Sequence, residues 1–274
     1  MTYCCIQEYL GDWVNILGHQ KAAFELLTSM FTPETIVQTP LGRMALGWYS
    51  RFDNFVAIMG GFPTSLPREY VESMVSYCES RVTQASSENI KWKLAIRTMR
   101  VRLVAWNMSS LYARASRGQM SKSEFALEHS RITRELVAWR ESWDPELTDP
   151  KYLVNDFGPV QADPDNIVDP YQPGVIYDQP IFSSTIANLE YHCMMITHRT
   201  LATYEPAQDL HTDLSKHAYA AFQHYEAVTQ WPRSPKGLTT IIQAAIPMAA
   251  LYLPRDQRHH MWIRRKFALS EQRG

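Results

Sequence analysis

The feature that most constrains this chain is the recurrence of apolar residues every three or four positions, the spacing that gathers side chains on one face of an α-helix. The clearest example predicts a long buried helix from about residue 88 to 116, with Arg97 occupying one position of the apolar stripe. The apolar members of this stripe are Ile90, Leu94, Val101, Val104, Met108 and Leu111.

A second long helix is predicted after Gly118, where Ser121 and Glu124 form the S-x-x-E pattern of a capping box. The apolar face that follows predicts that this helix packs antiparallel to the first. Its members are Phe125, His129, Ile132, Leu136 and Trp139.

Shorter stripes predict further helices at about 13–27, 45–59, 186–196 and 214–228. Gly60-Gly61 reads as a helix stop, and Pro67 and Pro254 read as first-turn prolines, which need no N–H partner. No alternating apolar pattern of comparable strength predicts a β-strand. The expected fold class is therefore all-α, a multi-helix array of antiparallel helices.

One segment, from about residue 144 to 180, interrupts the helical pattern with seven prolines and seven aspartates. Proline excludes helix over most of it, and a loop of this length inside a domain is usually functional or disordered. Its aromatic residues are expected to pin it to the helices; they are Tyr152, Phe157, Tyr171 and Tyr177. We expect the helices to form even without this loop, and the loop to control ligand access.

The length allows one large or two modest domains, and the composition favours a folded chain, since 45% of the residues are hydrophobic and 20% are charged. The formal net charge of -1 disfavours direct binding to nucleic acid. Cys4, Cys5, Cys78 and Cys193 match neither a disulfide framework nor a metal knuckle, which is typical of an intracellular protein. The longest apolar run, 244–253, is about half of the ~20 residues that a membrane span needs, so we expect no membrane association.

Three blocks of sequence carry a family resemblance. They are Gly42-Arg43-Met44-Ala45-Leu46-Gly47-Trp48-Tyr49-Ser50-Arg51-Phe52-Asp53, then Gly60-Gly61-Phe62-Pro63 with Leu66-Pro67-Arg68, and finally Leu253-Pro254-Arg255-Asp256 through Lys266-Phe267-Ala268. In this order they resemble the fungal-specific transcription factor domain, a large helical domain that in zinc-cluster regulators follows the DNA-binding finger. The resemblance implies a single helical domain over 1–274 that acts as a regulatory or ligand-sensing module, tied to fungal secondary metabolism and located in the nucleus or cytoplasm.

The chain departs from the family in two ways. The family's finger holds two zinc ions with six closely spaced cysteines, whereas the four cysteines here are scattered, so zinc-dependent DNA binding is not expected. The chain also ends at Gly274, where relatives usually continue, so it looks truncated or repurposed. The partners implied are full-length zinc-cluster regulators or a second copy of the chain. Arg264-Arg265-Lys266 is interpreted as a solvated basic face, with a weak nuclear-import signal as the alternative.

Sequence patterns for catalysis, cofactors and metals are absent. There is no nucleophile elbow and no glycine-rich phosphate cradle, so no cofactor is expected. Among the nine histidines, His192 and His198 are six residues apart and His217 and His224 are seven apart. Neither spacing places two imidazoles on one ion as i, i+4 does, and no metal site is predicted.

The abundance of aromatic residues and methionine nevertheless predicts a pocket for an apolar small molecule between helices. The candidate lining residues are Trp48, Tyr49, Arg51, Asp53, Arg97, His129 and His192. For Arg51 and Asp53 a charge pair that fixes helix packing is favoured over catalysis, and for His129 a core histidine bonded to a carbonyl is favoured over a base. The alternative function is a cofactor-free cyclase or isomerase, for example for a pericyclic cyclisation of an apolar intermediate of a fungal natural-product pathway.

Overall fold

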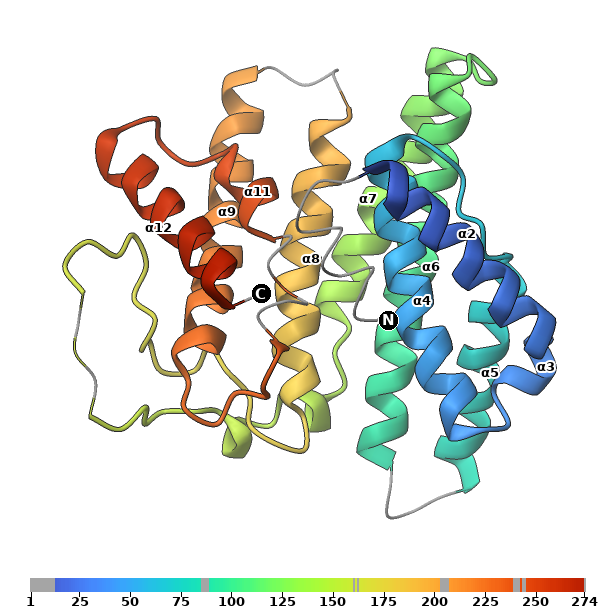
Figure 1. Cartoon of the computed structure of the whole chain (residues 1–274), viewed down its shortest axis with the longest axis horizontal. Coiled ribbons are helices and arrows are strands. Elements are labelled where there is room, and N and C mark those ends of the chain that lie inside the picture. Colours follow the sequence, from blue (N-terminus) through green and yellow to red (C-terminus); the bar gives the residue numbers. More distant parts are fainter. Residues whose placement is uncertain are drawn as a thin grey trace. The chain divides into compact units, whose positions relative to one another are not determined.

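The computed structural model describes residues 13–84, 89–159, 161, 163–202, 207–238, 242 and 245–273. Within these residues the regular structure is helical and no strand forms, although an isolated antiparallel β-bridge joins Leu153 and Tyr177 (Figure 1). The prediction of an all-α fold is confirmed.

The chain divides into two compact units, residues 1–144 and 145–274. The boundary coincides with the start of the loop that is rich in proline and aspartate. Each unit has its own cluster of buried apolar side chains. The single domain expected over 1–274 stays a prediction.

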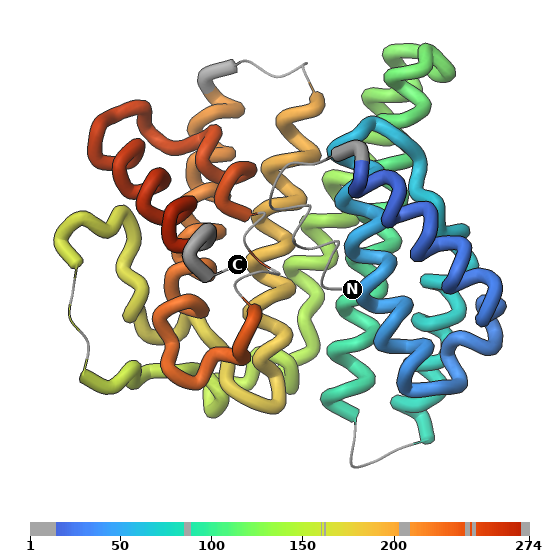
Figure 2. The backbone as a smooth tube through the Cα atoms, in the orientation of Figure 1, coloured from blue at the N-terminus to red at the C-terminus, as the bar shows by residue number. Residues whose placement is uncertain are grey.

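The first unit contains five long helices among its described residues, joined by short connections. They are α2 (Trp13–Met30), α4 (Pro40–Gly60), α5 (Arg68–Gln84), α6 (Asn89–Ser116) and α7 (Lys122–Glu141), with the short α3 (Pro33–Ile36) between the first two. Helix α6 packs against α4, α5 and α7 and is therefore the central helix of the unit. Figure 2 traces the backbone of these helices. Its bounds agree with the helix predicted from about 88 to 116.

The ends of these helices are set by the residues that the sequence singled out. The Ser121 side chain accepts from the Glu124 N–H, and the Glu124 carboxylate accepts from the Ser121 N–H at 2.7 Å, so the predicted capping box is confirmed. Gly61 ends α4 with φ of 68°, in the left-handed region that glycine adopts without a Cβ penalty. Helix α5 begins at Arg68, directly after Pro67.

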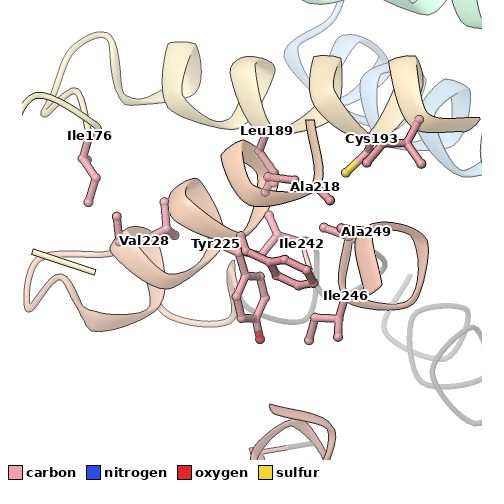
Figure 3. Close-up of a cluster of buried hydrophobic side chains, with 14 of the residues drawn as sticks. Ile176, Leu189, Cys193, Ala218, Tyr225, Val228, Ile242, Ile246 and Ala249 are labelled. Carbon is pink, nitrogen blue, oxygen red and sulfur yellow. The ribbon is translucent and has the colours of Figure 1, made fainter. Parts of the chain in front are cut away.

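The second unit is built on the helical pair α8 (Phe182–Thr200) and α9 (Ala207–Gln230), against which α11 (Ala245–Ala250) packs. Leu189 and Cys193 on α8 face Ala218 on α9, and Ile246 and Ala249 of α11 complete the cluster (Figure 3). The C-terminal helix α12 (Gln257–Arg273) contacts α11 and buries Trp262 completely.

The segment rich in proline and aspartate is part of this unit's core. After the 3-10 turns η1 (Pro145–Thr148) and η2 (Pro150–Tyr152) it buries Phe157, whose ring meets that of Tyr171 at 5.7 Å. The expectation that aromatic residues pin the loop is confirmed for these two. Val154 and Ile176 of the loop also lie in the apolar cluster that α8 and α9 share, and the expectation that the helices form without the loop stays a prediction.

Candidate functional site

Four candidate residues lie on α4, and two of them are almost fully buried. Tyr49 is 2% exposed and Asp53 1% exposed. Trp48 is half-buried and stacks on Phe52, with ring centroids 5.3 Å apart, and Arg51 is half-buried. These residues therefore line the packing face of α4.

The Asp53 carboxylate accepts hydrogen bonds from three donors outside α4. They are the Gln20 side-chain amide at 2.6 Å, the Ser65 N–H at 3.0 Å and the Leu66 N–H at 2.9 Å. Burial raises the pKa of Asp53 above its ordinary value, and the three hydrogen bonds oppose that rise in part. These contacts fasten α2 and the connection before α5 to α4, so Asp53 has a packing role, while its predicted charge pair with Arg51 stays a prediction.

Arg97 occupies a site between two indole rings. Its guanidinium carbon lies 4.4 Å from the ring centroid of Trp139 and 4.5 Å from that of Trp143. The guanidinium donates to the carbonyl oxygens of Trp139 and Ser142, so it satisfies the last carbonyls of α7 and complements the helix dipole. Desolvation, with the nearby charges of Arg100 and Arg140, lowers the pKa of Arg97 to about 10.

His129 lies at the edge of the core of the first unit. Its ring is half-buried and stacks on Phe125, with centroids 5.8 Å apart. The sequence suggested a core histidine, whereas the ring keeps access to solvent because the neighbouring positions on α7 are largely exposed.

The described contacts of the first unit do not gather these candidates into one site. Trp48, Tyr49 and Asp53 share α4, while Arg97 and His129 have different partners on α6 and α7. His192 belongs to the second unit.

His192 takes part in a cluster that the sequence did not predict. Its Nδ1 lies 2.9 Å from the Nδ1 of His217 on α9, and the His224 ring centroid is 5.8 Å from that of His192. The Tyr191 ring meets both His192 and His217 edge to face. Burial, with the charges of Arg199 and Lys216, lowers the pKa of His217, and Asp213 opposes this shift. The spacing of histidines along a single helix could not predict the contact between His192 and His217, because the two residues lie on different helices.

The third family-like block supplies one partner of a buried ion pair. The Lys266 ammonium is 2.6 Å from Oε2 of Glu226, whose side chain is fully buried, and lies 5.0 Å from the Trp262 ring centroid. Trp262 in turn meets Phe222 edge to face at 4.9 Å. This block therefore anchors α12 to α9.

Metal-binding clusters of three or more side chains and membrane-spanning helices are both absent from the residues that the structure describes. No group of three or more histidine, cysteine, aspartate or glutamate side chains is arranged to hold a metal ion there. In the same part of the chain, no helix combines the length and apolar character needed to cross a membrane.

Comparisons of the chain with protein-family models, curated proteins and solved structures find no match.

Proposed function

We propose that the chain is a regulatory, ligand-sensing helical module of the fungal-specific transcription factor kind, in the control of fungal secondary metabolism. The observation that carries the proposal is the position of the family-like blocks. The first supplies Leu46, Tyr49, Phe52 and Asp53 to the first core, and the last supplies Trp262 and Lys266 to the second. The resemblance therefore follows the residues that determine packing.

The polar candidates support regulation more than catalysis. The Asp53 carboxylate and the Arg97 guanidinium both form hydrogen bonds with backbone groups at helix ends and connections. General acid–base catalysis requires a group that can reach a substrate proton. Asp53 and Arg97 therefore stabilise the helices, and a regulatory function does not require either of them to act on a substrate.

Exposed apolar side chains on α2 and α4 favour a protein partner. Leu26 and Met30 share one face of α2 at 63% and 57% exposure, and Leu41 and Met44 share one face of α4 at 59% and 61%. Apolar side chains exposed together mark interaction surfaces. A full-length zinc-cluster regulator or a second copy of this chain is the partner proposed.

The test is co-expression with a full-length zinc-cluster regulator from the same fungus, with association and transcript levels as the readouts. We expect Leu26→Ser with Met44→Ser to abolish association and restore the transcript level seen without this chain. Leu127→Ser on α7, which is 67% exposed, is the matched control and should change neither.

Absence of association together with unchanged transcripts would refute the regulatory function. Deletion of the gene separates it from the cyclase alternative. Accumulation of one uncyclised precursor at unchanged transcript levels would support the enzyme instead.

A further inference from the structure

We propose that His192 and His217 form a binding site for one divalent transition-metal ion that prefers imidazole nitrogen, such as Zn²⁺ or Cu²⁺. The site lies within the second unit and does not depend on the proposed regulatory function. It rests on the position of two ring nitrogens from different helices.

The distance between the two nitrogens suits one shared ion. Zinc–imidazole bonds are about 2.0–2.1 Å long, so two nitrogens on one ion lie about 2.9–3.4 Å apart for angles between about 90° and 110°. The Nδ1 atoms of His192 and His217 are 2.9 Å apart, with ring centroids separated by 5.2 Å and planes inclined by 50°. Small ring rotations can turn both lone pairs toward one ion.

The two helices hold the pair in place from the buried side. His192 precedes Cys193, and His217 precedes Ala218, and both of these neighbours lie in the cluster between α8 and α9 (Figure 3). Both rings are only half-buried, so an ion reaches them from solvent. The backbone positions are therefore fixed by packing before an ion arrives, which reduces the cost of assembling the site.

Without a metal ion, a hydrogen lies between the two Nδ1 atoms. In their hydrogen bond one Nδ1 carries a hydrogen and donates, and the other accepts. A metal ion can bind both nitrogens once the hydrogen of the donor ring has moved from Nδ1 to Nε2 by exchange with solvent, so each ring stays neutral with its hydrogen on Nε2 and no net proton is released. Binding of the ion thus replaces a hydrogen bond by a change of tautomer in one ring at an existing contact.

The surrounding charges set the limits of the site. Asp213, one turn before His217, forms an ion pair with Arg199 of α8 and so neutralises the positive charge of that arginine. The His224 Nδ1 lies 2.8 Å from the carbonyl oxygen of Ala220, so that nitrogen is already engaged. Because no third histidine, cysteine or carboxylate side chain converges among the described residues, the ion retains water in its other positions. Imidazole with water suits Cu²⁺ and Zn²⁺ better than Mg²⁺ or Ca²⁺.

The first experiment measures Cu²⁺ binding to the full chain by electron paramagnetic resonance and by calorimetry. We expect a signal split by two nitrogens in the wild type, and its loss together with at least a tenfold weaker binding in His192→Gln and in His217→Gln. His260→Gln, which changes an exposed histidine of α12, is the matched control and should retain the signal.

A second measurement uses only the wild-type chain, in case a glutamine variant does not fold. Diethyl pyrocarbonate modifies accessible imidazoles, and mass spectrometry locates the products. We expect Zn²⁺ to protect His192 and His217 and to leave His260 reactive. Equal modification of these residues with and without Zn²⁺, or an unchanged copper signal in folded glutamine variants, would overturn the proposal.

Discussion

The buried ion pair between Glu226 and Lys266 offers the sharpest test of how the second unit is held together. The substitution Lys266→Met removes the cation and retains the length and apolar character of the side chain. Glu226 then lies fully buried without the ammonium that is 2.6 Å from its carboxylate. We expect α12 to lose much of its attachment to α9.

The expected loss is large because the remaining charge has no water around it. Removing one partner of a buried ion pair costs about 3–5 kcal/mol, whereas replacing both partners by apolar residues is often neutral. The double variant Glu226→Met/Lys266→Met should therefore lie within about 1 kcal/mol of the wild type. An exposed pair supplies the control: Lys151→Met breaks an ion pair with Asp149 in which the lysine side chain is 62% exposed, and should lower the free energy of unfolding far less than Lys266→Met does.

The assay is urea unfolding of the full chain, combined with hydrogen exchange of peptides from α9 and α12. Exchange assigns the loss to the second unit even when the two units unfold in separate transitions. If Lys266→Met costs no more than Lys151→Met, the pair does not hold α12. If the double variant is as unstable as the single one, the cost lies in lost packing against Trp262 and the electrostatic reasoning fails.

Four further predictions concern the first unit. Asp53→Ala should lower the free energy of unfolding by roughly 2–4 kcal/mol, because buried donors left without an acceptor cost about 1–3 kcal/mol each; a loss below 1 kcal/mol in urea unfolding would contradict it. Because the folded pKa of Asp53 is raised, wild-type stability should fall as pH rises from the ordinary value of 3.8 through the folded pKa, and Asp53→Asn should flatten that slope. Arg97→Met should cost roughly 2–3 kcal/mol through lost bonds to the end of α7 and lost stacking, and faster hydrogen exchange there is the readout. Burial raises the pKa of Cys78 to about 11, so Cys78 should resist alkylation at pH 8 in the folded chain and react after unfolding, as located by mass spectrometry.

The helices of this fold could be predicted from the sequence because their signals are local. The stripe of α6 and the Ser121 capping box depend on residues at most four positions apart, and both appear in the structure at the predicted places. The packing role of Asp53 was anticipated only in outline. Its partner Gln20 is 33 positions away, and no periodic pattern relates the two residues.

The histidine contact between α8 and α9 was not predictable for the same reason. Which residue of α9 meets His192 depends on the length of the connection and on how the two helices pack, since helices pack in several preferred crossing angles. A test restricted to i, i+4 spacing excludes only sites on a single helix. Pairs of histidines on neighbouring amphipathic helices deserve the same attention once a helical hairpin is predicted, because packing brings residues 25 positions apart within hydrogen-bonding distance.

The acidic loop and the basic end of the chain are best understood as partners. Arg265 contacts the carboxylates of Asp163 at 3.5 Å and Asp165 at 3.3 Å, and the Trp262 indole N–H donates to the Asn166 side chain at 3.1 Å. Lys266 is committed to Glu226. Two of the three residues in the Arg264-Arg265-Lys266 cluster therefore neutralise acidic groups within their own unit. Because Lys266 is buried, the interpretation of the whole cluster as a solvated basic face is wrong for that residue, and the contacts of Arg265 and Lys266 attach α12 to its own unit. The nuclear-import alternative stays a prediction.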